Sequence, residues 1–220
     1  GGAITVNSSS GTTGGSVPLN ITILNSGGTT FNQSVSALTV DLQNTNGTIL
    51  FSNDTSITAL ATNLAAFNLS FTGATNTFTN AVTFDNTGTL NLGDASGDTF
   101  TFNAGVTEST SGTVTLASSI SSSNDAVSFG AVTLGANTTI DTNATDTTGD
   151  ITIAAITGGS NNLTLSTGDN IANSDITASG AISGLGNLTL ADVGGTATFS
   201  ANVAAAALTA DSTVANITFT

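Results

Sequence analysis

Two neighbouring stretches of the chain decide the fold: residues 149–170 read GDITIAAITGGSNNLTLSTGDN, and residues 174–195 read SDITASGAISGLGNLTLADVGG. Each begins with Asp-Ile-Thr, passes through a short Gly- and Ser-rich segment, and continues as Asn-Leu-Thr-Leu. The second follows the first at an offset of 25 residues. A repeat of this length is typical of a solenoid, in which each unit stacks on the one before it.

Apolar residues outside this repeat recur at every second position. In residues 38–42, 67–71 and 217–219, Leu, Val, Ile or Phe alternates with Thr, Asp, Asn or Ser. This is the period of a β-strand with one buried face. The segments between such bursts are rich in Gly, Asn, Asp and Ser, which favour turns. The pattern predicts an all-β protein, and Val203–Ala210 is the one stretch where a helical turn could form.

The expected architecture is a parallel β-helix, or β-solenoid. With about 20–25 residues per coil, the chain would form about ten coils. An antiparallel β-sandwich of the pilin or surface-layer type remains the alternative, because alternation by itself does not distinguish parallel from antiparallel pairing. We expect the solenoid repeats over residues 61–220. Residues 1–60 hold the longest polar stretch and the single proline, Pro18, and are expected to form an N-terminal β segment that serves as a linker or an exchanged strand.

Three strings in the chain resemble the repeats of filamentous-haemagglutinin-like bacterial surface proteins: TLNLGDASGDTFTFNAG, AVTLGANTTIDTNATDTTGDITI and NNLTLSTGDNI. The similarity extends from about Thr89 to Ala210 and is weak before Leu60. It lies in the style of the repeats, and no binding motif of that family is matched. The resemblance implies a right-handed parallel β-helix, secretion, and a role in adhesion or in the structure of the cell surface.

The composition excludes several classes of function. The chain has 14 acidic residues and no Lys, Arg, His or Cys, so its formal net charge is −14. Nucleic acid is excluded as a partner because phosphate binding requires basic residues. The chain lacks the His, Cys and Lys side chains that usually act as bases or nucleophiles, so we expect no enzymatic activity. It also has no apolar run long enough to span a membrane.

Metal binding is the one chemical activity that the composition allows. Without His or Cys, the chain could bind only a hard cation such as Ca²⁺. The densest group of oxygen ligands is DTNATDTTGD, which contains Asp141, Asn143, Asp146 and Asp150, and this loop is the candidate for a weak, stabilising Ca²⁺ site. Asp94 and Asp98 form a second candidate. The alternative for both loops is that the carboxylates shape turns and keep the surface soluble.

Two further patterns concern the surface. Asn-X-Ser/Thr glycosylation sequons begin at Asn7, Asn20, Asn32, Asn46, Asn53, Asn68, Asn137, Asn143, Asn162, Asn187 and Asn216. Chance predicts about eight in a chain this rich in Ser and Thr, so the number alone does not indicate glycosylation. Thr-X-Thr pairs such as Thr77/Thr79 are spaced irregularly, which argues against the aligned rows that an ice-binding face requires.

The expected function is that of an extracellular structural protein, either a subunit of a surface filament or a segment of a large repetitive adhesin. A chain without Lys or Arg offers trypsin-like proteases no cleavage site, which favours this location; compositional drift in a repeat explains the absence equally well. The expected partner is a second copy, joined head to tail, or the continuation of a longer chain. The alternative function is a module that binds carbohydrate, such as surface glycans, or a host surface.

Overall fold

The computed structural model describes residues 4–6, 19–43, 45–143, 145, 148–168 and 172–220. The described residues form 23 strands and no helix. The strands are β1 (Ile4–Val6), β2 (Asn20–Leu24), β3 (Thr29–Phe31), β4 (Val35–Gln43), β5 (Thr48–Phe51), β6 (Thr55–Thr62), β7 (Asn68–Phe71), β8 (Thr75–Phe78), β9 (Val82–Phe84), β10 (Thr89–Leu92), β11 (Thr99–Phe102), β12 (Val106–Glu108), β13 (Thr113–Leu116), β14 (Ser119–Ser122), β15 (Val127–Leu134), β16 (Thr138–Asp141), β17 (Ile151–Thr157), β18 (Leu163–Ser166), β19 (Ile176–Ala178), β20 (Ile182–Ala191), β21 (Thr196–Phe199), β22 (Val203–Ala210) and β23 (Asn216–Phe219).

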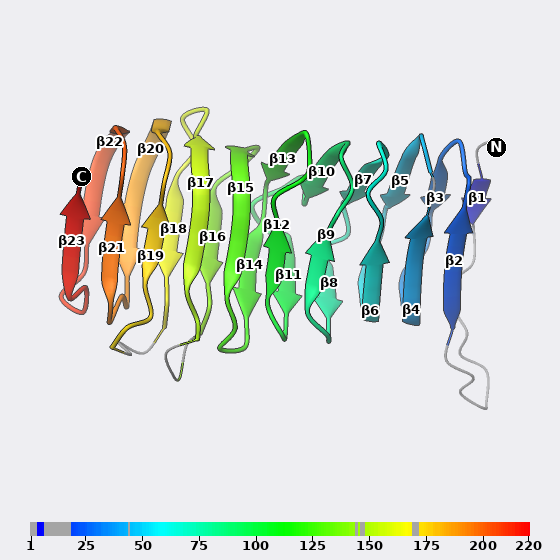
Figure 1. The fold of residues 1–220 in the computed structure, drawn as a ribbon, viewed down its shortest axis with the longest axis horizontal. Helices are drawn as coiled ribbons and strands as arrows, with labels where there is room; N and C mark the ends of the chain where they lie inside the picture. Colours follow the sequence, from blue (N-terminus) through cyan, green and yellow to red (C-terminus); the bar gives the residue numbers. More distant parts are fainter. Residues whose placement is uncertain (1–3, 7–18, 44, 144, 146–147, 169–171) are drawn as a thin grey trace.

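All strand pairs are parallel, and each strand pairs with the equivalent strand of the next coil. A coil has three faces. Face 1 contains β7, β10 and β13; face 2 contains β8, β11 and β14; and face 3 contains β9, β12 and the first half of β15. The strands therefore lie side by side along the long axis, as Figure 1 shows. This arrangement confirms the parallel β-solenoid, with about nine stacked coils, and excludes the antiparallel sandwich.

The length of a coil varies along the chain. Paired residues are 18 positions apart at Leu116 and Leu134, but 26 positions apart at Ile156 and Ile182. The extra residues lie in the turns between faces, so the register within each face is preserved. A fixed repeat length is therefore visible only where two neighbouring coils happen to be equally long.

Aromatic and aliphatic side chains stack in the interior. The rings of Phe31, Phe51 and Phe71 lie one above the other, with 4.7 Å between neighbouring centroids. Leu92 continues this row in the next coil. Because alternate residues of a strand point to opposite faces, stacking in register brings like residues together and shields them from water. The core is thus a set of continuous apolar rows along the solenoid axis.

The stretch Val203–Ala210, where the alanines made a helical turn possible, forms a strand, β22. Its backbone pairs with β20 over six registered positions, among them Leu188 with Leu208. The high helix propensity of alanine is overridden here because β20 offers a row of backbone partners that a helix could not use.

Pairing continues across residue 60. Strand β4 pairs with β6, and β6 pairs with β8, so residues on both sides of this position belong to one sheet. Whether residues 1–60 act as a separate unit stays a prediction, and most of residues 1–18 lie outside the described part of the chain.

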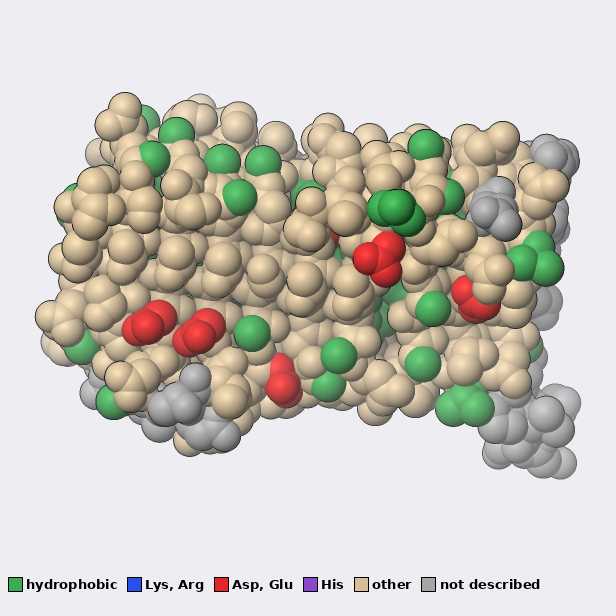
Figure 2. Space-filling view, in the orientation of Figure 1, with side chains coloured by type: hydrophobic (Ala, Val, Ile, Leu, Met, Phe, Trp, Pro, Cys, Tyr) green, Lys and Arg blue, Asp and Glu red, His purple; other side chains and the backbone are tan. Residues whose placement is uncertain are grey.

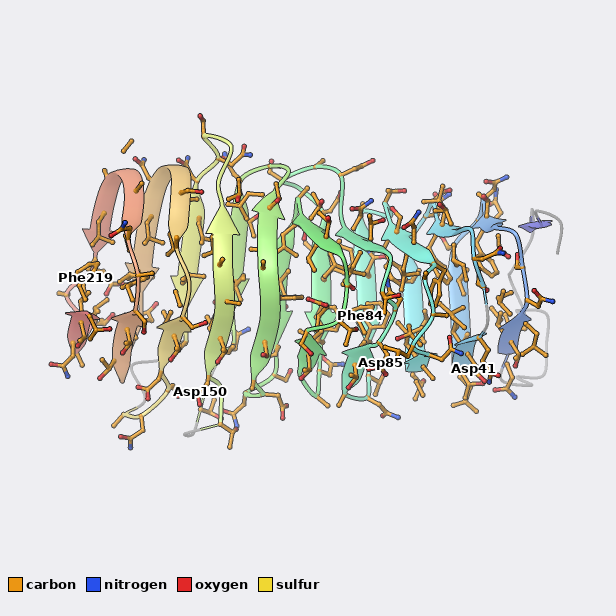
Figure 3. All side chains as sticks on the ribbon, turned by 45° about the horizontal axis from the view of Figure 1, so that its top comes forward. Asp41, Phe84, Asp85, Asp150 and Phe219 are labelled. Atoms are coloured by element: carbon orange, nitrogen blue, oxygen red, sulfur yellow. The ribbon has the colours of Figure 1, made fainter. Side chains whose placement is uncertain are left out.

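The last described coil has one neighbour instead of two. Strand β22 pairs only with β20 and β23 only with β21 among the described strands. Leu208 is consequently 42% exposed and Phe219 57% exposed; Figure 3 shows Phe219 at this end of the stack. The described residues contain no helix that could cross a membrane.

Candidate functional site

The predicted calcium loop joins face 2 to face 3. Asp141 is the last residue of β16, and its Oδ1 accepts the backbone N–H of Asn143 at 2.9 Å. Asn143 has a positive φ of 47°, which asparagine tolerates, and its Nδ2 donates to the carbonyl oxygen of Ser122 at 3.1 Å. Asp150 precedes β17 at the other end of the loop, on the lower side in Figure 3. Asp146 lies outside the described residues.

The bonds of these side chains favour the turn-shaping alternative without testing calcium binding. Asp150 Oδ1 accepts the N–H of Asp175 at 2.8 Å, so this carboxylate joins two coils. No group of three or more acidic side chains in the described part of the chain is placed to hold a metal ion. The Ca²⁺ site therefore stays a prediction. Calorimetric titration with Ca²⁺, and melting with and without a chelator, would test it.

The second acidic loop closes on itself. Asp98 is 7% exposed, and its Oδ2 accepts the backbone N–H groups of Asp94 and Ala95 at 2.9 and 3.1 Å. A carboxylate that accepts two N–H groups within four residues fixes the turn between β10 and β11. These bonds favour the turn-shaping alternative, and a cation site at Asp94 and Asp98 stays a prediction.

Side-chain oxygens at the corners hydrogen-bond the next coil repeatedly. In each case an Asp or Asn Oδ1 accepts a backbone N–H about one coil further along the chain. With the residue that donates its backbone N–H named first, the pairs are Thr75 to Asp54, Thr89 to Asn68, Asn162 to Asn137, Asp175 to Asp150, Asn187 to Asn162, and Thr196 to Asp175. The repeated Asp-Ile-Thr and Asn-Leu-Thr signals in the sequence mark these corners. The sequence did not reveal that the acidic or amide group bonds the neighbouring coil.

Hydroxyl side chains form continuous rows on the outer surface. The row on face 2 consists of Thr75, Thr99, Ser119, Thr139, Thr164, Thr189 and Thr209. The row on face 3 consists of Thr83, Thr107, Ser128, Thr152, Thr177, Thr198 and Thr218. The prediction that the threonines are not aligned is thus wrong. The turns between strands differ in length, so threonines that are irregularly spaced in the sequence still line up in the structure. Because two faces carry such a row, we attribute the rows to the general preference of threonine for strands and to the solubility of the surface.

One acidic residue lies inside the solenoid. Glu108 is 2% exposed and pairs in register with the buried Phe84 of the previous coil. Its Oε1 accepts the N–H of Ser111 at 2.6 Å, and its Oε2 accepts the N–H of Gly130 at 3.3 Å. Sequence reasoning missed this residue. The sequence contained the relevant signal: Glu108 follows Val106 by two positions, and residues two positions apart in a strand point to the same face, here the interior.

A shallow groove of about 180 Å³ lies on the outer surface. It is lined by Gly112, Thr113, Ala131, Val132, Thr133, Ala155 and Thr157. The small side chains leave the depression, and the threonine hydroxyls are its only side-chain hydrogen-bonding groups. On the face that Figure 2 shows, a few acidic side chains lie among backbone and uncharged polar side chains, with small apolar spots.

No family model matches the chain, and neither a curated protein nor a solved structure is significantly similar to it. What the resemblance to filamentous-haemagglutinin-like proteins implied is therefore shown only at the level of the fold, a parallel β-solenoid.

Proposed function

We propose that the chain is a non-catalytic structural protein of an extracellular surface, either a subunit of a filament or a segment of a large adhesin. The observation that carries this proposal is the edge of the last described coil. No described strand pairs with the far side of β22 and β23, and Leu208 and Phe219 lie exposed beside it. Backbone groups at such an edge pair readily with another strand.

The occupant of this edge is a further coil, from a second copy or from a continuation of the chain. Successive coils within the molecule already show the required geometry, parallel and in register. A second copy joined in this way would leave its own far end open, so that assembly would proceed as an open fibre. With about nine coils at ~4.8 Å each, the subunit repeat would be roughly 45 Å.

Electron microscopy of the purified chain at near-neutral pH tests the filament version. We expect fibres with an axial repeat of one subunit. Phe219→Asp should abolish them, because a charge at the contact would have to be desolvated. Leu64→Asp is the matched control: Leu64 is 73% exposed on the side of the stack, so this variant should still form fibres. Short rods from the unmodified chain would contradict self-assembly and favour a segment of an adhesin.

The alternative function is a carbohydrate- or host-surface-binding module, and the groove between Thr113, Thr133 and Thr157 is the observation that favours it. Hydroxyl groups on a rigid surface can hydrogen-bond a sugar, although the chain has no Trp or Tyr to stack on one. Binding on a glycan array, lost in Thr133→Val, would support this alternative. An array without signal would remove it.

A further inference from the structure

Exposure separates the asparagines of glycosylation sequons from the other asparagines. Of the eleven sequon asparagines, ten have side chains that the structure describes, and all ten are exposed. Eleven asparagines outside sequons are described as well, and only four of these are exposed. The exposed sequon residues are Asn20, Asn32, Asn46, Asn53, Asn68, Asn137, Asn143, Asn162, Asn187 and Asn216. The number of sequons is near chance, but their placement is not.

Strand alternation explains only part of this difference. In the sequon of Asn187, for example, Leu188 points inward, so the asparagine and the threonine must both point outward. The sequons of Asn32, Asn46 and Asn53 lie at turns, where alternation does not apply, and their asparagines are exposed too. By contrast Asn76 and Asn86, which lie outside sequons, are buried.

The hydrogen bonds of one asparagine column leave the reactive atom available. Asn137 Oδ1 accepts the N–H of Asn162 at 2.9 Å, and Asn162 Oδ1 accepts the N–H of Asn187 at 2.8 Å. These bonds use only the carbonyl oxygen. None of the hydrogen bonds within the described residues uses Nδ2 of these three side chains. A substituent on Nδ2 would therefore keep the bonds between coils.

We propose that the asparagines of this column, Asn137, Asn162 and Asn187, are N-glycosylation sites. In the reaction, Nδ2 attacks the anomeric carbon of a sugar diphosphate donor, either nucleotide- or lipid-linked. A nitrogen–carbon bond forms, the bond between the anomeric carbon and the phosphate oxygen breaks, the diphosphate leaves, and Nδ2 gives up one proton. Sugars on Asn137, Asn162 and Asn187 would project from the side of the solenoid, and none of these residues belongs to β22 or β23. The inference goes beyond the assembly function and does not require it.

The test is mass spectrometry of the full chain isolated from its source. We expect a mass above the 21.4 kDa of the polypeptide, by whole hexose or hexosamine increments. Because the chain has no Lys or Arg, peptides would be produced with an Asp-specific protease. Enzymatic release in H₂¹⁸O should leave labelled aspartate at the sequon positions. An unmodified mass, or sugar without labelled aspartate, would overturn the proposal.

A pair of variants made in the same source gives the matched control. Thr164→Val destroys the sequon of Asn162, whereas Thr177→Val changes a similar outward threonine that belongs to no sequon. Both replacements keep a β-branched side chain, which suits a strand. The peptide that holds Asn162 should lose its sugar in the first variant and keep it in the second. Retention of that sugar in both would contradict the assignment, whatever the outcome of the fibre experiment.

Discussion

Replacing Phe51 by alanine should destabilise one part of the solenoid much more than the rest. Phe51 is fully buried, and its ring stacks at 4.7 Å on Phe31 in one neighbouring coil and on Phe71 in the other. Removal of a buried phenylalanine side chain costs about 3–5 kcal/mol. We expect a loss in stability of about 4 kcal/mol. Phe31 and Phe71 would both lose the ring on which they stack, and the rigid coils on either side cannot collapse into the cavity.

The control is Phe219→Ala, because Phe219 is 57% exposed and stacks on a single ring, Phe199, at 5.4 Å. Its replacement should cost about 1 kcal/mol. Long repeat arrays need not unfold in one step, so the assay is hydrogen exchange resolved along the chain. In Phe51→Ala, protection should fall mainly in residues 29–71, since each coil contacts only its neighbours. Equal costs for the two variants, or a uniform loss of protection along the chain, would refute the reasoning.

Three further outcomes test the polar contacts. Asn162→Ala removes the side-chain acceptor between two coils and should lower the free energy of local opening, measured by hydrogen exchange in these coils, by about 1 kcal/mol. Asn202→Ala, which changes an exposed side chain, should shift it by less than about 0.5 kcal/mol. Glu108→Ala removes the carboxylate that accepts two partly buried backbone N–H groups and should cost about 1–3 kcal/mol; unchanged stability would contradict its placement. The hydroxyl of Thr213 donates to Asp211 and holds the pKa of that carboxyl below its usual value, so its small contribution to stability is present above the usual pKa and is lost as the pH falls through the lowered one. An NMR titration should show this pKa rising towards the usual value in Thr213→Val.

The period of the apolar residues was sufficient to predict the fold. Alternation at residues 38–42 and 67–71 appears in the structure as strands β4 and β7, and the 25-residue offset between residues 149–170 and 174–195 predicted the parallel stack. The register of the other coils could not be predicted, because coil length is set by turns that tolerate insertion. At Val203–Ala210 the sequence left a helical turn possible, and strand β20, not local propensity, determines that the stretch is a strand.

The functional residues were less accessible to sequence reasoning. Asp141 and Asp150 were visible as an acidic loop, but only the structure shows Asp150 bonded to the N–H of Asp175. An Asp that binds a cation and an Asp that caps a neighbouring strand look the same in a sequence. Glu108 was overlooked because a carboxylate is rarely expected inside a core, where its charge needs hydrogen bonds to be tolerated.

The absence of basic residues bears on the direction in which this molecule could assemble. Asp150 and Asp175 lie in adjacent coils, one position before the paired Ile151 and Ile176. Two carboxylates at the spacing of the coils, ~4.8 Å, repel each other by about 0.9 kcal/mol in water, and a hydrogen bond from a backbone N–H to a charged oxygen contributes about 1.5–3 kcal/mol. Within the stack, such bonds therefore offset the repulsion. Two solenoids packed side by side would face each other's carboxylates without any such donor. The last described coil, residues 203–220, carries a single acidic residue, Asp211, in the turn between β22 and β23, and its strands offer backbone groups that no described strand pairs with. Electrostatics thus disfavours sideways bundling and leaves end-to-end contact along the axis as the favoured route of association.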